Sequence, residues 1–198
     1  QKGKAAEGGP RPQGLEERGP QAQAPGGVVE REKTAGHRRS IVGARMVKHR
    51  FTVEAYHRAY EAGALPERVE LLEGEVYATP PMGKKHRLYV MHLDRTFQEA
   101  LGSEAVVMVQ CPLLLSEVSE PVPDLALLRP PLEAYRDKDP TPEDALLVVE
   151  VADSTLVQDR GLKLPLYQKA GVPEVWIVNL LEEVLEVYAF PHYLPERH

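Results

Sequence analysis

Two carboxylates stand where a negative charge is costly. Glu150 interrupts the apolar run ALLVVEVA (145–152), and Asp124 follows Pro123 at the start of a second apolar run, LALL. A charged carboxylate inside a buried strand costs several kcal/mol unless it is paired or binds a cation. If the two runs are neighbouring strands of a hairpin, the two side chains converge at one end of the sheet. There, either one carboxylate takes up a proton or a divalent cation lies between them.

The available ligands are oxygen atoms, which indicates both the kind of metal and the kind of reaction. Oxygen-only sites suit Mg²⁺ or Mn²⁺, and these ions keep several waters, which leaves room for a phosphate. An ion held in this way activates a water molecule and polarises a phosphodiester. Asp124 and Glu150 therefore predict metal-assisted phosphodiester hydrolysis.

The spacing of apolar residues predicts the elements that position these two side chains. It predicts helices over 52–63, 84–102 and 159–171, a hairpin over 67–80 that turns at Glu73-Gly74, and strands over 105–115, 123–129, 145–152, 172–179 and 182–190. Gly161 and Pro165 weaken the first half of the third helix, so Pro165 lies near its true start or kinks it. This order predicts an α/β or α+β fold with a mixed sheet.

Composition divides the chain near residue 45. Residues 1–45 are rich in Gly, Pro, Gln and charge, which predicts a disordered or extended tail, and periodic sequence begins at Met46. We expect one domain over residues 46–198, because 198 residues with 42% hydrophobic content provide one good core. The tail holds 9 Lys/Arg and 5 Asp/Glu (+4) and the remainder 15 and 25 (−10), which sum to −6. An acidic domain is not typical of a non-specific DNA binder, so any nucleic-acid role must depend on a local site.

Other features bear on the compartment. The chain has neither 18 consecutive apolar residues nor an apolar signal segment, so we expect a soluble, cytoplasmic protein. Cys111 is the only cysteine, which excludes an internal disulfide; its apolar neighbours predict a small core residue. Asn179 is the only asparagine, a bias found in proteins of thermophiles.

The order of the motifs resembles a known family. A PD pair, a spacer of 25 residues and an apolar strand with E-x form the skeleton of the PD-(D/E)XK nuclease superfamily. Within it, the chain resembles the Uma-type family of bacterial endonucleases, formerly a domain of unknown function. The matching pieces are VELLEGEVYATPP (69–81), His86, VPDLALL (122–128), LLVVEVADST (146–155), DRGLKLPLYQKAGVPEVWIV (159–178) and a final LEVYAF. They cover most of residues 67–190, and the pieces after Glu150 make the resemblance specific.

The resemblance implies a restriction-endonuclease-like core, with a mixed sheet flanked by helices and an N-terminal hairpin extension. It implies an endonuclease that hydrolyses DNA with Mg²⁺ or Mn²⁺, bound by Asp124, Glu150 and the backbone carbonyl of Val151. Glu70 matches a family carboxylate and is a third metal ligand, a residue that orients a ligand, or an ordinary outward strand residue. A homodimer is plausible because cutting both strands of a duplex requires two sites.

One position departs from the superfamily pattern. The superfamily lysine lies two residues after the glutamate, where alternation along the strand points both side chains to one face. This chain has Ala152 there. Lys163 is the replacement that the resemblance implies, at the start of the following helix; the other interpretation is a solvated lysine at the edge of the core.

Two further residues have open roles. His86 either faces a phosphate in the cleft or caps a helix at the surface, and Tyr167 either contacts substrate or belongs to the core. Ala152 also keeps a second function open, in which a catalytically inactive nuclease-fold protein binds nucleic acid or a partner. A buried Glu150 without a role would be purely costly, which favours the enzyme.

Overall fold

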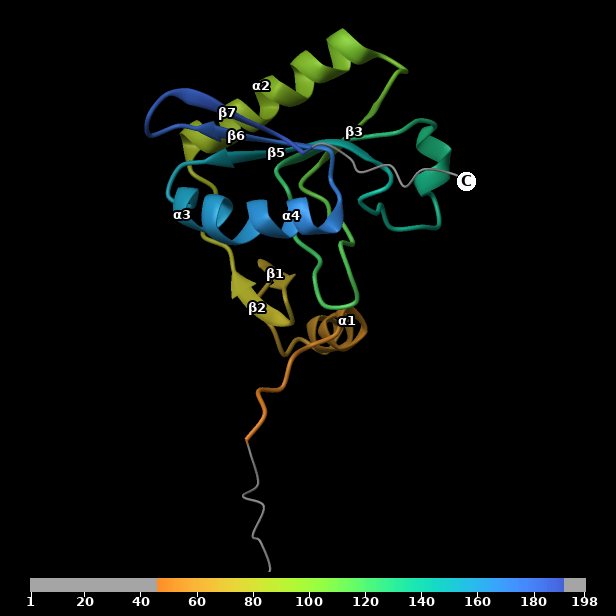
Figure 1. The fold of residues 1–198 in the computed structure, drawn as a ribbon, viewed down its shortest axis with the longest axis vertical. Coiled ribbons are helices and arrows are strands. Elements are labelled where there is room, and N and C mark those ends of the chain that lie inside the picture. Colours follow the sequence, from red (N-terminus) through yellow and green to blue (C-terminus); the bar gives the residue numbers. More distant parts are fainter. Residues whose placement is uncertain (1–45, 191–198) are drawn as a thin grey trace, which may run out of the picture. The chain divides into compact units, whose positions relative to one another are not determined.

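The computed structural model describes residues 46–190 (Figure 1). The predicted tail over residues 1–45 lies outside these residues, as do residues 191–198. The elements are α1 (Val53–Glu61), β1 (Val69–Leu72), β2 (Glu75–Ala78), α2 (Lys84–Leu101), β3 (Val106–Val109), β4 (Leu125–Leu128), the 3-10 helix η1 (Leu132–Tyr135), β5 (Ala145–Ala152), α3 (Leu156–Gln158), the π-helical turn η2 (Asp159–Lys163), α4 (Leu164–Ala170), β6 (Glu174–Asn179) and β7 (Val184–Ala189). None of the helices in residues 46–190 is long and apolar enough to cross a membrane.

A mixed five-stranded sheet forms the centre of the fold, in the order β3-β4-β5-β6-β7. Neighbouring strands run antiparallel except β5 and β6, which are parallel and are joined by the crossover through α3, η2 and α4. Parallel neighbours need such a crossover, whereas antiparallel neighbours can be joined by short turns. The predicted mixed α/β fold is confirmed.

Helices cover the two faces of the sheet (Figure 1). α2 packs its Val90, Leu93 and Phe97 on one face, against apolar residues of β4 and β5. The other face packs against α4, where Tyr167 is fully buried. β5 is buried almost throughout because helices cover both of its faces, which explains its nearly continuous apolar sequence.

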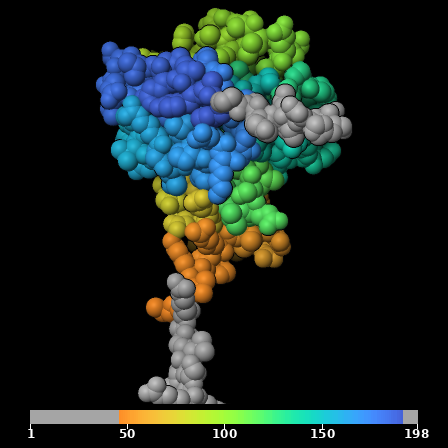
Figure 2. Space-filling view, in the orientation of Figure 1, coloured from red at the N-terminus to blue at the C-terminus, as the bar shows by residue number. Residues whose placement is uncertain are grey.

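The predicted hairpin is confirmed as β1 and β2, outside the main sheet. Its turn residues Glu73 and Gly74 have φ values of 50° and 78°, the left-handed conformation that two-residue hairpin turns require. A Cβ atom at Gly74 would lie 2.5 Å from the Cβ of Arg50, so glycine is needed there for space as well. Figure 2 shows this hairpin next to α4, and α1 next to the segment that precedes β4.

Two predictions in the third strand are wrong. The strand predicted over 105–115 ends at Val109, because Gln110 turns the chain with a φ of 48° and Pro112 cannot donate to a ladder. Cys111 is therefore exposed and is not a core residue.

The helix predicted over 159–171 contains an irregular first turn. Helical backbone starts at Leu156 and passes through the π turn η2 before α4. In a regular α-helix, Pro165 would leave the carbonyl of Gly161 without a donor and its ring would collide with that carbonyl. A wider turn directly before the proline avoids the collision. In a regular α-helix, residues four positions apart differ by about 40° in direction around the helix axis. The wider turn offsets this rotation, so that Asp159, Lys163 and Tyr167 all point to the same side and are buried.

Candidate active site

A cavity of about 480 Å³ opens at the end of β4 and β5. Its walls come from the hairpin, the start of α2, the segment before β4, and the chain from β5 into η2. Several predicted site residues line it, namely Glu70, His86, Asp124, Glu150 and Lys163. Asp159, which was not predicted, lines it as well. The fold thus gathers residues that are up to 93 positions apart in the sequence, from Glu70 to Lys163.

Asp124 and Glu150 converge as predicted. β4 and β5 are antiparallel with Leu125 opposite Val149, so continuing this register places Asp124 opposite Glu150 on one face. Burial favours protonation of Asp124, yet its pKa is lowered, because its oxygens accept hydrogen bonds from His86 Nε2 (2.9 Å), Val151 N (2.8 Å) and Gln110 Nε2 (3.2 Å). Asp124 is therefore held in place as a carboxylate.

The backbone carbonyl of Val151 has no ladder donor on the β4 side. The register places Pro123 opposite Val151, and a proline has no N–H to offer. The N–H of Val151, which points to the same side, donates instead to Asp124. Pro123 thus leaves the Val151 carbonyl without a ladder partner, on the residue whose N–H binds Asp124.

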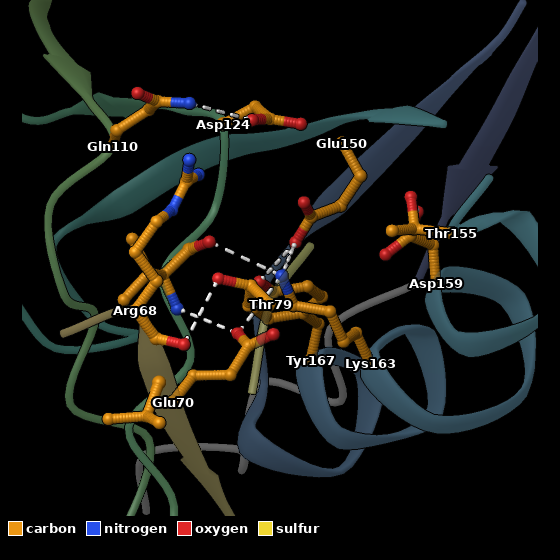
Figure 3. Close-up of polar contacts among 12 residues, drawn as sticks. Arg68, Glu70, Thr79, Gln110, Asp124, Glu150, Thr155, Asp159, Lys163 and Tyr167 are labelled. Carbon is orange, nitrogen blue, oxygen red and sulfur yellow. Dashed lines mark hydrogen bonds and ion pairs between the residues drawn. The ribbon is translucent and has the colours of Figure 1, made fainter. Parts of the chain in front are cut away.

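Lys163 reaches Glu150 from the end of η2. Its Nζ lies 2.8 Å from Glu150 Oε1, 3.1 Å from Glu70 Oε2 and 3.2 Å from the carbonyl oxygen of Val122 (Figure 3). An ammonium has three N–H donors, so each one has a partner. Burial would lower the pKa of Lys163, but the carboxylates of Glu150 and Glu70 outweigh it and raise that pKa. Lys163 is therefore a buried cation and not a solvated lysine.

Apolar side chains fill the space beside Ala152. Ala152 is fully buried and packs with Leu156 and Ile177. A lysine at this position would place a charged side chain next to this buried apolar cluster, which is costly. The packing therefore agrees with an ammonium that comes from the helix.

Glu150 has a second partner in Tyr167. The tyrosine hydroxyl donates to Glu150 Oε1 over 2.6 Å, from a side chain that is fully buried and does not line the cavity. Burial raises the pKa of Glu150 to about 8, although Lys163 opposes the rise. Tyr167 therefore supports Glu150 from the core side, and Oε2 of Glu150 accepts no hydrogen bond from the described residues.

Glu70 and His86 are both fixed beside these residues. Glu70 is 6% exposed, and its Oε2 accepts the N–H of Val122 (3.1 Å) in addition to the contact with Lys163. The hydrogen bond with Asp124 raises the pKa of His86 against the effect of burial. The other ring nitrogen of His86, Nδ1, is buried and has no partner within residues 46–190.

Two functional candidates were not predicted. Asp159 is 5% exposed and accepts a hydrogen bond from Thr155 Oγ1 (2.7 Å), and burial raises its pKa. Its spacing of four residues before Lys163 on a predicted helix was a usable signal. Gln110 offered none, because its contact with Asp124 depends on the turn that ends β3.

The oxygen atoms of this site are the kind of ligand that a divalent ion takes. Within the part of the chain that the structure describes, no group of three or more His, Cys, Asp or Glu side chains is arranged to hold a metal ion. Mg²⁺, however, commonly takes only one or two carboxylates and keeps several waters. Asp124 and Glu150 supply carboxylate oxygens at one wall of a cavity large enough for waters, and the Val151 carbonyl directly follows Glu150 along β5. These residues fit Mg²⁺ or Mn²⁺.

The comparisons with known proteins agree with this architecture. No curated protein matches the chain. The fold is similar to a crystal structure described as a putative nuclease belonging to DUF820 from Anabaena variabilis ATCC 29413, with a TM-score of 0.55, 16% sequence identity, and coverage of 75% of this chain and 82% of that chain. At that identity the likeness shows the fold alone. Residues 53–198 match the model of the Uma2 family, described as "Putative restriction endonuclease". The chain therefore belongs to the Uma2 family of putative restriction endonucleases.

Proposed function

We propose that the protein is a metal-dependent endonuclease that hydrolyses phosphodiester bonds of DNA. Asp124, Glu150 and the Val151 carbonyl would hold Mg²⁺ or Mn²⁺, with Glu70 close by as an orienting carboxylate. When bound, the ion activates a water and neutralises charge at the phosphate. The observation that carries the proposal is the 2.8 Å contact between Lys163 and Glu150, because it restores a cation to the carboxylate that lacks the usual strand lysine.

The protein's own residues have separate tasks in this proposal. Lys163 binds the carboxyl groups of both Glu150 and Glu70, and release of its bond to Glu70 would free one N–H for a phosphate oxygen. Asp124 is fixed as an anion by His86, Gln110 and the N–H of Val151. Tyr167 holds Oε1 of Glu150, so that Oε2 is left for the cavity.

Cleavage assays with supercoiled plasmid and with single-stranded DNA, in Mg²⁺ or Mn²⁺, test the proposal. We expect Asp124→Asn, Glu150→Gln and Lys163→Ala each to lower the cleavage rate by about 100-fold or more, the usual effect of removing a group that stabilises the transition state. The matched control is Lys169→Ala, because Lys169 lies on α4 with an exposed side chain 3.6 Å from Glu73 and outside the cavity.

Two results would contradict the proposal. Activity that survives Lys163→Ala and Asp124→Asn would show that these residues are not the catalytic ones. A wild type that cuts neither substrate, and binds Mn²⁺ in calorimetry no better than Glu150→Gln, would favour the second candidate, an inactive nuclease fold that binds nucleic acid or a partner. The observation that keeps this candidate is that Ala152, and not a lysine, stands two residues after Glu150.

A further inference from the structure

The charges on the cavity wall are poorly suited to a phosphodiester. Among residues 46–190, six acidic side chains line the cavity but only three basic ones, which are Arg68, His86 and Lys163. A DNA strand brings further negative charge, and one divalent ion offsets only part of this excess. A substrate strand therefore needs a cation on the wall that is not already neutralised.

Two of the three basic side chains already have anionic partners. Lys163 is bound by Glu150 and Glu70, and His86 is bound by Asp124. Arg68 is different, because its guanidinium forms no hydrogen bond or ion pair with any side chain in residues 46–190, and only its backbone carbonyl is engaged. Among the described residues, Arg68 is thus the one basic side chain of the cavity wall that has no anionic partner.

The backbone of Arg68 is held firmly while its side chain projects. The carbonyl of Arg68 accepts the N–H of Thr79 (2.9 Å) and lies 3.4 Å from the Thr79 hydroxyl, at the open end of the hairpin. The side chain is exposed, and in Figure 3 its guanidinium extends from the hairpin toward Gln110 and Asp124. A guanidinium fork matches two phosphate oxygens at once, which a lysine ammonium cannot do.

We propose that Arg68 forms a phosphate-binding subsite on the hairpin wall, where it holds a backbone phosphate of the DNA strand whose bond is cut at Asp124 and Glu150. This subsite rests on the proposed nuclease function. It gives the N-terminal hairpin a task in substrate binding, and it separates binding, on the hairpin, from bond cleavage, on the sheet.

The experiment compares Arg68→Ala and Arg68→Lys with Arg136→Ala. Arg136 is also exposed and lies outside the cavity, so its removal makes the same change in net charge. Binding of a fluorescent DNA duplex is measured by anisotropy over a range of salt concentrations, and cleavage of the same duplex in Mn²⁺ gives kcat and KM. Calorimetry with Mn²⁺ alone shows whether the metal site is intact.

We expect Arg68→Ala to weaken DNA binding about tenfold and to lower the slope of log affinity against log salt by about one, as for the loss of one phosphate contact. KM should rise by a similar factor with kcat within about twofold of wild type, and Mn²⁺ affinity should not fall. Arg68→Lys should retain the salt slope and only part of the affinity. Equal behaviour of Arg68→Ala and Arg136→Ala in binding and in salt slope overturns the subsite. A wild type that binds DNA through Arg68 without cutting it supports the subsite and overturns the proposed nuclease function alone.

Discussion

At the scale of single residues, the site depends on where one ammonium group comes from. The superfamily pattern places it on the strand, two residues after the glutamate, whereas here Lys163 brings it from the crossover helix. Position 152 on the strand belongs to the core, because Ala152 packs with Leu156 and Ile177. The two positions are therefore not interchangeable in this chain.

Moving the lysine back to the strand should fail. We expect the double variant Lys163→Ala with Ala152→Lys to cut DNA no faster than Lys163→Ala alone, because Ala152 is fully buried and packs in an apolar cluster with Leu156 and Ile177. The added volume should lower the free energy of unfolding by about 1–3 kcal/mol relative to Lys163→Ala. Cleavage rates and urea unfolding measure the two effects. The volume control is Ala152→Leu in the same background, and recovery of cleavage by the lysine would contradict the argument.

At the scale of elements, periodicity and turn residues predicted most of the fold. The hairpin at Glu73-Gly74, the helix α2 and the strand β5 agree with the predicted ranges because each has a strong local signal in its own sequence. β3 was predicted too long because the left-handed turn at Gln110 has no sequence signal of its own, and Pro112, which did signal an end, was passed over. The π turn could not be predicted in detail, since Gly161 and Pro165 indicate only that an α-helix is disturbed.

The sequence also predicted the central pair of the site, and it missed what depends on tertiary contacts. Asp124 and Glu150 could be paired because their strands are neighbours along the chain. The contact between Glu70 and Lys163 joins the hairpin to the crossover, and no periodicity reports on that distance. The free guanidinium of Arg68 is likewise visible only once its neighbours are placed.

An ion pair joins the crossover to β7, and it should make the free energy of unfolding depend on pH. Arg160 binds Glu186 through Nε (2.9 Å) and Nη2 (2.5 Å), and these bonds lower the pKa of Glu186 to about 2. A carboxyl group with a lowered pKa stabilises the fold above its ordinary pKa, and this stabilisation is lost as the pH falls from about 4.5 toward about 2.

The variant Glu186→Gln should therefore be less stable than wild type at pH 6, and the difference should disappear as the pH approaches about 2. Urea unfolding at several pH values gives the two curves. Glu99→Gln is the control, because its pair with Arg95 is exposed on α2 and should change stability by less than about 0.5 kcal/mol at any pH. A constant gap between wild type and Glu186→Gln down to pH 2.5 would rule out the ion pair as its cause.

At the scale of the whole molecule, the cavity joins segments that no local structure connects. The hairpin supplies Glu70, the sheet supplies Asp124 and Glu150, and the crossover supplies Lys163. A ligand that binds these residues only when they are together must stabilise the folded state as a whole.

A divalent ion should therefore raise the melting temperature. We expect Mn²⁺ at about 100 times its Kd to add about 2.7 kcal/mol to the free energy of unfolding, which is several degrees for a domain of this size. EDTA should reverse the shift, and Asp124→Asn should abolish it. Thermal unfolding followed by circular dichroism measures this, with Asp137→Asn as a control, since Asp137 is exposed and outside the cavity. An equal shift in Asp124→Asn would place the ion elsewhere.

The contact between Glu70 and Lys163 also sets the order in which the site becomes complete during synthesis. The hairpin leaves the ribosome early, but Glu70 can bind Lys163 only after a further 93 residues have been synthesised. Long loops must also close before such a contact forms. A nascent chain that already carries the hairpin, Asp124 and Glu150 thus lacks the ammonium that Glu70 and Glu150 bind, and the site is complete only when the crossover has been made and packed.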